Sequence, residues 1–533
     1  MSFFSLSNPS VRSYTQSIPR DIVFLSESYK DVLEFEEKYA GIYNITSLLV
    51  SGRFEKTCLS LDEFRISGYF PELLITYTAK GCIDFEKCNY CGECYSVCPV
   101  NCIDLDLGID FDKCIFCDRC KELCKQGAID VNLAFTGSIS TPFIVTNIKD
   151  VLDEYGEQAG VFNTKDMDKV FALTGDFQVS EIIEHGKDIC QFNEKLKYGC
   201  ERCLGECPHN ALYVENGEIK VNHILCKACG KCVAVCPTGA MQSKLMLDKS
   251  LYELLSAESG SRIAVVGNKE DLRKFSWVNE NHEDIFKIEA DPSFFNTANY
   301  LSFFAKGYSN LYLLGREPMI NNEIAFSNKL IDYLFKKKNF IKYLSDYKLP
   351  SGNSENPLKE TMPGSEFSSR RGLLSNILKF LYRKGGVKDV LIEEPYLNIF
   401  GEVLVDETKC SLCLSCVQHC KIGALTANSS EYSLHHTPSS CIQCKICEEV
   451  CPEEAIRIRS GLLLSESFFE THLLHKSEPV VCPSCGKEFG VKVAHERVMN
   501  KLRQKGFGEN RLSDLRYCDM CRIKVKLQEG NYG

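Results

Sequence analysis

Apolar and polar positions change their spacing along the chain, and these changes divide it into segments. Short apolar runs at 21–28, 42–52 and 73–81 are typical of strands, whereas 30–41 has helical spacing and closes at Gly41. The order of strand and then helix recurs at 142–157. We therefore expect small α/β segments at 1–81 and 142–186.

A longer alternation of strands and helices lies between 244 and 348. Runs at 261–275, 284–291 and 309–318 read as strands, and apolar stretches of helical spacing separate them. This order predicts an α/β domain with a parallel sheet. Its IAVVGN turn has one glycine where a dinucleotide-binding turn has three. We therefore interpret it as a docking or spacer domain rather than a cofactor site.

A polar region follows the α/β domain. Residues 349–372 are rich in serine, glycine, proline and charge, which predicts a flexible linker that a protease would cut at Arg370–Arg371. Leu373, Ile377 and Leu381 then mark an amphipathic helix.

Cysteine dominates the stretches between these segments. The 533 residues include 31 cysteines, and their spacing argues for metal ligation in a reducing compartment rather than for disulfides. The pattern C-x2-C-x2-C-x3-C occurs in tandem at 88–124 and again at 410–451, and a variant occupies 190–236. Three thiolates from one such turn bind one [4Fe–4S] cluster, and the fourth cysteine reaches the second cluster of the pair. Zinc sites usually pair two C-x2-C knuckles, so zinc fits these units poorly.

Crossed ligation assigns the cysteines of the first and third units to four clusters. The expected sets are Cys88, Cys91, Cys94 with Cys124; Cys114, Cys117, Cys120 with Cys98; Cys410, Cys413, Cys416 with Cys451; and Cys441, Cys444, Cys447 with Cys420.

The second unit departs from the pattern because Lys197 stands where its first cysteine is expected. One set remains complete: Cys226, Cys229, Cys232 with Cys207. The other retains Cys200, Cys203 and Cys236, and the upstream Cys190 is the candidate replacement. A three-iron cluster, or a cubane with a ligand such as His185 or His209, is the alternative. Cys58, Cys82 and Cys102 lie outside any complete set, and we interpret them as packed or idle thiols. Cys82 and Cys102 flank the first cluster motif, so the alternative role for these two is to tune its surroundings.

The C-terminal region, 461–533, carries a different pattern. Two C-x2-C knuckles, Cys482/Cys485 and Cys518/Cys521, flank a helix-forming stretch. This pattern predicts one structural Zn²⁺ in a zinc-ribbon-like tail, with a rubredoxin-like mononuclear iron as the alternative.

The predicted fold class is thus α+β and multidomain: three 2[4Fe–4S] ferredoxin-like units alternate with small α/β segments and precede a four-cysteine, metal-binding tail. The expected units are 82–135, 187–243 and 373–460. The formal net charge of −10 disfavours nucleic acid as a partner and favours a protein with a basic docking patch. Because no leader peptide or spanning apolar run is evident, we expect a cytoplasmic location and no direct membrane span.

The three units resemble bacterial-type 2[4Fe–4S] ferredoxins, and the chain is similar to polyferredoxins and to multi-cluster subunits of anaerobic oxidoreductases. The resemblance implies six [4Fe–4S] clusters and a non-catalytic electron-wire subunit for low-potential electrons. It implies a redox partner such as a large subunit of formate dehydrogenase, hydrogenase or heterodisulfide-reductase type, with a small ferredoxin or a quinone-linked protein as a further acceptor. The alternatives are a flavin-binding oxidoreductase that uses the α/β domain, and a redox-sensing or cluster-storage protein.

Overall fold

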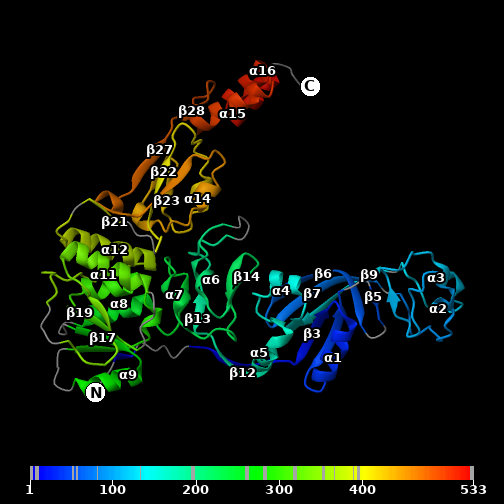
Figure 1. Cartoon of the computed structure of the whole chain (residues 1–533). Coiled ribbons are helices and arrows are strands. Elements are labelled where there is room, and N and C mark those ends of the chain that lie inside the picture. The colour runs from blue at the N-terminus through cyan, green and yellow to red at the C-terminus, as the bar shows by residue number, and fades with distance from the viewer. Residues whose placement is uncertain are drawn as a thin grey trace.

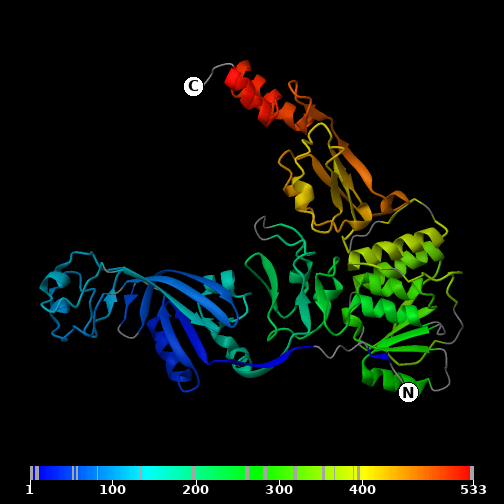
Figure 2. The same cartoon turned by 180° about the vertical axis from the view of Figure 1, so that it is seen from behind.

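The computed structural model describes residues 4–528, except 6–10, 51–52, 56–57, 81, 133, 194–197, 259–262, 280–284, 316–320, 351–354, 365, 388 and 393–396. The described residues form a row of domains (Figure 1, Figure 2). The first cysteine-rich unit lies at one end, the second unit lies in the middle, and the α/β domain lies at the other end with the third unit and the tail above it. Within these ranges, no helix combines the length and apolar character needed to cross a membrane.

The N-terminal domain is built on a seven-stranded sheet of order β11-β10-β3-β4-β6-β7-β9. Its strands are β3 (Asp21–Ser26), β4 (Asn44–Leu49), β6 (Leu59–Tyr69), β7 (Glu72–Lys80), β9 (Ala134–Thr141), β10 (Phe143–Thr146) and β11 (Val161–Asn163). Its helices are α1 (Tyr29–Tyr39), α4 (Lys149–Tyr155) and α5 (Met167–Ala172). Strands β10 and β3 pair in parallel, and their apolar residues are buried on both faces of the sheet.

This pairing corrects the predicted division of the N-terminal half. Residues 1–81 and 142–186 supply strands to the same sheet, so they form one domain rather than two segments. The first cysteine-rich unit leaves the sheet at the end of β7 and re-enters at β9. It is therefore an insertion between two long antiparallel strands, with the short elements α2 (Glu93–Val97), β8 (Ile109–Asp110) and α3 (Arg119–Leu123). Strand β5 (Arg53–Phe54), which precedes β6 in the N-terminal domain, pairs with β8.

The second unit packs against the opposite end of the same sheet. Its strands are β13 (Ile183–His185), β14 (Leu212–Glu215), β15 (Glu218–Val221) and β16 (Met241–Ser243), and its helices are α6 (Arg202–Glu206) and α7 (Lys231–Ala234). Asn222 Nδ2 donates to Phe70 O in the turn between β6 and β7, and the ring of Tyr69 lies 4.2 Å from that of Tyr213. An antiparallel ribbon of β2 (Ser13–Ile18) and β12 (Gly175–Ser180) runs beside this junction.

The α/β domain has a wholly parallel five-stranded sheet of order β1-β18-β17-β19-β20, which confirms the predicted parallel arrangement. The strands are β17 (Ile263–Gly267), β18 (Ile285–Glu289), β19 (Asn310–Leu314), β20 (Ile341–Leu344) and β1 (Phe4–Ser5), which joins from the N-terminus. The helices are α8 (Asp248–Ala257), α9 (Lys269–Val278), α10 (Thr297–Ala305), α11 (Asn322–Phe335) and α12 (Arg370–Lys384). All nine residues of α10 are buried, so this helix is the centre of the core.

The predicted linker is wrong over much of its described length. Asn356 donates to Phe304 O and Tyr308 O, and Met362 is buried against the α/β domain. Helix α12 begins at Arg370, two residues before the predicted end of the linker, and both Arg370 and Arg371 are buried. Composition suggested mobility because it cannot register acceptors that come from distant parts of the chain. Residues 351–354 and 365 lie outside the described residues.

The third unit continues from the α/β domain through a shared apolar core that includes Phe400 and Phe468. Its elements are β21 (Val390–Ile392), β22 (Gly401–Val405), α13 (Ser415–Gln418), β23 (Leu425–Asn428), β24 (Ser433–His436), α14 (Ile446–Glu449), β25 (Ile456–Ser460), β26 (Leu462–Leu464) and β27 (His472–Lys476). Helix α12, which we expected in this unit, packs mainly on α10 and belongs to the core of the α/β domain.

The tail consists of a short hairpin followed by helices. Its elements are β28 (Pro479–Val481), β29 (Glu488–Val491), α15 (Lys492–Gln504), α16 (Glu509–Ser513) and α17 (Asp519–Gln528). The second cysteine knuckle lies at the start of α17 rather than in a second hairpin. The tail therefore differs from the zinc ribbon that we expected, which would need two β-knuckles.

Candidate metal centres

The cysteine motifs share an unusual backbone. In five of the six motifs, the residues directly before and directly after the second cysteine have a left-handed backbone conformation, with φ from 48° to 78°. These pairs are Tyr90 and Gly92, Phe116 and Asp118, Ala228 and Gly230, Leu412 and Leu414, and Gln443 and Lys445. Left-handed turns of this kind point successive N–H groups into one concavity that favours anions. The strain in eight non-glycine residues indicates a functional loop.

The N–H groups of these loops reach the sulfurs. Gln443 N–H donates to Cys441 Sγ over 3.4 Å, and Phe116 N–H donates to Cys114 Sγ over 3.4 Å. The last cysteine of a motif follows a short helix and accepts from further along the chain, as Cys207 Sγ does from Ala211 N–H and Cys451 Sγ from Ala455 N–H. Such hydrogen bonds stabilise a thiolate and raise the potential of a cluster that it binds.

The fold brings the predicted crossed sets of the second and third units together. Cys207 lines one cavity with Cys226, Cys229 and Cys232. Cys420 lines another with Cys441, Cys444 and Cys447, among mostly apolar side chains, and Cys416 of the neighbouring set also borders it. Burial, followed by the nearby thiols of Cys410, Cys413 and Cys451, raises the pKa of Cys416 to about 12. Each group therefore contains three cysteines of one motif and the last cysteine of its partner motif.

Cys190 lies with the incomplete set. Burial, and then the neighbouring thiols of Cys236, Cys200 and Cys190, raise the pKa of Cys203 far above its usual range. Cys190 is itself buried, and burial followed by the nearby Cys236 raises its pKa. Lys197, at the position of the missing cysteine, lies outside the described residues.

The two alternative ligands occupy different places. His209 lines the cavity of the Cys226 set, so it lies at the wrong site to replace the missing cysteine. His185 lines the same cavity as Cys190, and burial lowers its pKa. His185 therefore remains the alternative, and Cys190 is the sulfur that the fold places among the other three.

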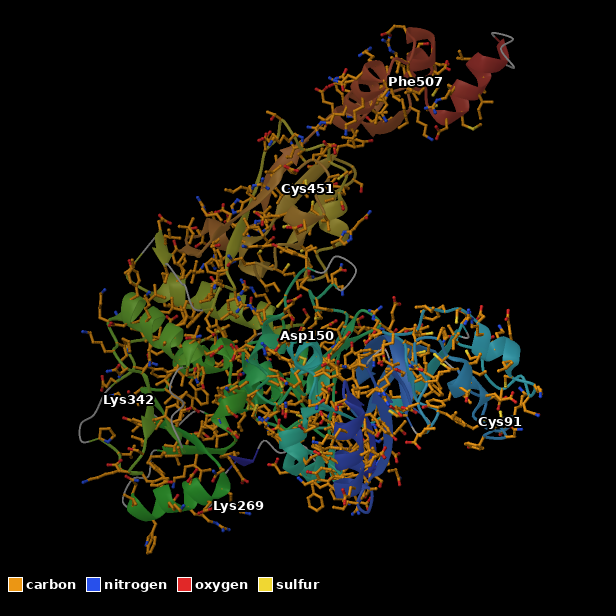
Figure 3. All side chains as sticks on the ribbon, turned by 45° about the vertical axis from the view of Figure 1, so that its right-hand side comes forward. Cys91, Asp150, Lys269, Lys342, Cys451 and Phe507 are labelled. Carbon is orange, nitrogen blue, oxygen red and sulfur yellow. The ribbon has the colours of Figure 1, made fainter. Side chains whose placement is uncertain are left out.

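In the first unit, cysteines of the same motif also lie close together, but some of them are more exposed than those of the second unit. Burial is the main cause that raises the pKa of the Cys120 thiol to about 11, and the nearby thiols of Cys114 and Cys117 raise it further. Cys91 and Cys117 are exposed, and Cys91 lies at the outer end of the unit (Figure 3). In the second unit, by contrast, every described cysteine is buried or half-buried.

The cysteines outside the sets differ in their surroundings. Cys102 is buried with its sulfur 3.3 Å from Cys98 Sγ, and its N–H donates to that same sulfur. It therefore lies directly against the Cys98 position of a predicted set. Cys58 donates to Ser47 O within the N-terminal domain, where burial raises its pKa to about 12. Cys82 is buried in the core of the first unit.

The second and third units meet at their cysteine groups. Gln191, beside Cys190, is 1% exposed, and its side-chain amide lies 3.7 Å from Cys444 Sγ. The same amide reaches the backbone of 419–422, next to Cys420. The backbone oxygen of Gln191 accepts from Cys200 N–H. One residue thus contacts a predicted set of each unit.

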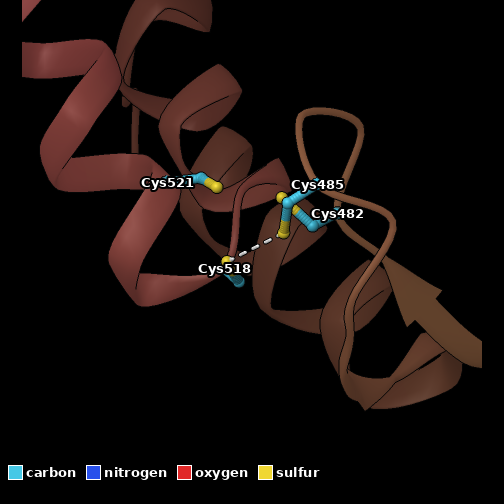
Figure 4. Close-up of side chains that lie close together, drawn as sticks. All are labelled: Cys482, Cys485, Cys518 and Cys521. Atoms are coloured by element: carbon cyan, nitrogen blue, oxygen red, sulfur yellow. Dashed lines mark hydrogen bonds between the residues drawn. The ribbon is translucent and has the colours of Figure 1, made fainter.

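The four tail cysteines form a compact group (Figure 4). The sulfurs of Cys482, Cys485, Cys518 and Cys521 all lie within 4.8 Å of one another, and those of Cys485 and Cys518 are 3.7 Å apart. Burial raises the pKa of Cys482, but backbone N–H groups, led by that of Cys518, outweigh it and lower the pKa to about 6. Four thiols at this spacing suit a tetrahedral ion with four sulfur ligands, such as Zn²⁺.

Comparison with known proteins supports the metal assignment of the units. Residues 198–241 match the family of 4Fe-4S dicluster domains, and 82–104, 107–130 and 435–457 match that of 4Fe-4S binding domains. The chain carries ferredoxin-type 4Fe-4S domains. Iron–sulfur electron transfer is the function that such domains support.

Two curated relatives share short stretches with this chain. One is a subunit of the ion-translocating oxidoreductase complex of Methanosarcina acetivorans, 37% identical over 59 residues, which cover 11% of this chain and 22% of that protein. The other is the archaeal-type glutamate synthase (NADPH) of Thermotoga maritima, 37% identical over 56 residues, which cover 10% of this chain and 11% of that protein. Since the chain spans less than a quarter of either relative, the likeness is limited to a short stretch and does not extend to the whole proteins.

Proposed function

We propose that this chain is an electron-transfer subunit with six [4Fe–4S] clusters and one structural Zn²⁺, which carries low-potential electrons between a catalytic oxidoreductase and an acceptor. The observation that carries the proposal is the crossed grouping of the cysteines within N–H-rich loops. A [4Fe–4S] cluster, when bound, takes up and releases one electron. A reducing compartment, for which we propose the cytoplasm, would keep so many thiols available.

The residues present fit such clusters. Thiolates are the soft ligands that iron–sulfur clusters take. Unassisted burial raises the pKa of Cys447 well above its usual range, so a cavity of this kind needs a bound cation to hold its sulfurs as thiolates. The loop N–H groups supply the matching hydrogen bonds. The chain's own contribution is thus to fix the sulfurs, exclude water and set the local charge.

The first unit provides a docking surface for the redox partner. Large apolar side chains are exposed on the unit that carries the exposed Cys91 and Cys117; they include Tyr90, Leu105, Ile115, Phe116 and Leu123. Residues 82–132 contain ten acidic and five basic residues, a net charge of −5. An apolar centre within an acidic surround fits a partner whose docking face has an apolar centre and a basic rim.

We further propose which classes of protein the redox partner belongs to. One relative is named as a subunit of an oxidoreductase complex, which supports assembly with a catalytic subunit. We place formate dehydrogenase, hydrogenase and heterodisulfide-reductase-type large subunits first, with a small ferredoxin or a quinone-linked protein as acceptor.

The flavin alternative finds little support in the α/β domain. The glycine of its first turn, Gly267, packs against Leu314, whose Cβ would lie 2.8 Å from an added side chain. The N-terminus of α9 is capped by Asn268, and the carboxylate of Asp271 lies beside it. A carboxylate there would repel the phosphates that a nucleotide brings to such a helix end. The domain therefore fits a structural role.

Metal analysis of anaerobically reconstituted protein tests the cluster count. We expect about 24 irons, four for each of six cubanes, with about one zinc in the tail. Fewer than about 16 irons per chain would overturn the six-cluster proposal. Iron above about 24 without zinc would assign the tail to mononuclear iron. Clusters that are reduced and reoxidised without loss would exclude the storage alternative.

The docking surface is tested by charge reversal. Glu86 and Glu122 are exposed on the first unit, and E86K/E122K should slow electron transfer to a basic c-type cytochrome at low salt about tenfold or more. At high salt the difference should vanish because screening removes the attraction. E37K/D153K makes the same charge change on exposed helices of the N-terminal domain and should leave the rate nearly unchanged. Equal slowing by both variants would refute docking at the first unit.

A further inference from the structure

Two adjacent arginines begin α12, and each binds a different cysteine-rich unit. Arg370 Nη1 donates to Val233 O and Cys236 O in the second unit. Arg371 Nε donates to Ser439 O over 2.8 Å, and its Nη2 donates to Cys441 O, both in the third unit. Arg370 is 6% exposed and Arg371 is 4% exposed. One helix turn therefore links the second unit to the third.

The two charges are compensated differently. Arg370 Nε lies 2.7 Å from the Asp248 carboxylate, so the pair is nearly neutral. Across the described ranges, no carboxylate lies within ion-pair distance of Arg371, and its Nη1 has no hydrogen-bond acceptor. Its guanidinium lies over the ring of Phe400, 4.7 Å from the centroid. An arginine guanidinium keeps its charge at neutral pH even when it is buried.

An uncompensated charge inside a protein is costly, and one is retained only where something balances it. The nearest anionic group that the chain can assemble is the Cys441 set, since Arg371 holds the carbonyl of Cys441 itself. A cubane bound by four thiolates carries a charge of about −2 when oxidised and about −3 when reduced. Such a group at this site would supply the counter-charge that Arg371 lacks.

We propose that Arg371 is the counter-ion of the cluster held by Cys420, Cys441, Cys444 and Cys447, and that it raises the reduction potential of that cluster. The inference rests on the proposed electron-transfer function and deepens it. One-electron reduction by an external reductant adds one negative charge and changes no covalent bond. A fixed positive charge stabilises the reduced form more than the oxidised form, so it favours uptake of the electron.

The position of this site determines the direction in which the charge on Arg371 favours electron transfer between the two units. Gln191 joins the Cys441 set to the set of Cys190 and Cys200 in the second unit. The arginine on the second-unit side, Arg370, is already neutralised by Asp248. Arg371 therefore raises the potential on the third-unit side of the junction selectively, and electrons arriving from the second unit move toward the third.

The test compares three variants of the full-length, reconstituted protein by EPR-monitored redox titration with dithionite. R371Q removes the charge but keeps amide donors for the two carbonyls. R371K keeps the charge. R383M removes an exposed arginine from the same helix, one that pairs with Glu466. We expect R371Q to lower the reduction equilibrium constant of one cluster at least tenfold, or 59 mV for one electron, whereas R371K and R383M leave it within about threefold.

Each outcome decides the proposal. Loss of one cluster in R371Q but not in R371K would also support it, because the charge would then be required for binding. An unchanged potential in R371Q with full iron content would overturn it, and so would equal loss of the cluster in R371Q and R371K, which would show a purely structural role. Absence of [4Fe–4S] signals from the unmodified protein would instead refute the proposed function, so the two failures are distinguishable.

Discussion

Replacement of Arg370 by methionine should destabilise the helix turn that joins the two cysteine-rich units. The side chains of Arg370 and Asp248 are 5% and 12% exposed, and Nε lies 2.7 Å from Oδ2. Methionine matches much of the arginine's apolar length but leaves the Asp248 carboxylate buried without a cation. Removal of one partner of a buried pair costs about 3–5 kcal/mol.

The surroundings of Asp248 set the expected value within that range. Asn296 Nδ2 and Asn299 Nδ2 donate to Asp248 Oδ1 over 2.8 and 3.0 Å, and both bonds survive the substitution. We therefore expect the lower end, about 3 kcal/mol. Each 1.36 kcal/mol is tenfold in an equilibrium constant, so local opening should become about a hundredfold more frequent.

Hydrogen exchange of the cluster-loaded protein measures this change. Peptides from α8 and α12 should lose about a hundredfold in protection in R370M. R383M, on the exposed side of the same helix, should leave protection unchanged because exposed ion pairs contribute little. D248N/R370M should recover part of the loss, since it removes the buried charge as well. Equal protection in R370M and R383M would refute the reasoning.

The pH dependence of the same measurement has a definite sign. Burial raises the pKa of Asp248, but the charge of Arg370 and the hydrogen bonds outweigh it, so the pKa lies below its usual value. The stabilisation by the pair is therefore complete above the ordinary carboxyl pKa of about 3.9 and is lost as the pH falls through the lowered value. In R370M the charge of Arg370 no longer lowers the pKa of Asp248, while burial still raises it and only the two amide hydrogen bonds oppose burial. Asp248 therefore takes up a proton more easily in R370M than in the parent. The difference between R370M and the parent should accordingly shrink as the pH falls from 7 toward 4.

Three further predictions concern the remaining sites. C190A should lower the iron content from about 24 to about 23 per chain and give a three-iron EPR signal near g of about 2.01 in oxidised protein. The same signal in the parent would show a natively three-iron site, whereas no change in the variant would favour His185 as the ligand. C521S should abolish binding of about one zinc and leave the iron content unchanged; retained zinc would show that the four sulfurs are not its ligands. Limited trypsin digestion of folded protein should spare the Arg370–Arg371 bond, because both side chains are buried; first cleavage there would mean that α12 does not hold in solution.

The cysteine groups could be predicted because their determinants are local. Each motif places its first three sulfurs within one short loop, so spacing alone specifies which sulfurs meet. Cys190 could be identified as a candidate ligand by elimination, because it is the one spare thiol shortly upstream of a motif that lacks its first cysteine. The sequence indicated that Cys102 flanks the first motif, but its sulfur contact with Cys98 depends on how the chain turns after α2.

The domain organisation was harder to predict because it depends on non-local strand pairing. Strand β10 joins β3 across more than a hundred residues, with Phe143 opposite Ile22, and neither strand carries a mark of its partner. The same holds for β1, which lies near the N-terminus and pairs with β18 in the middle of the chain. The burial of Arg370 and Arg371 escaped prediction for a related reason. A charged pair in a polar stretch suggests solvent exposure, and the acceptors that bury it come from 233–236, 248 and 439–441.

The arrangement of the three units argues against one uniform electron wire. The second and third units touch through Gln191 and share α12, whereas β7 separates the first unit from the second. The turn at Tyr69–Phe70 packs on the second unit, and the nine residues of β7 lead away from it to the first unit. At about 3.4 Å per residue, this strand spans about 30 Å. Two exposed cysteines of the predicted sets, Cys91 and Cys117, and the apolar, acidic surface also lie on this outlying unit, whereas the third unit has one, Cys413. We therefore expect the first unit to exchange electrons with a docked partner, and a partner that spans the N-terminal domain to be needed before its electrons reach the joined second and third units.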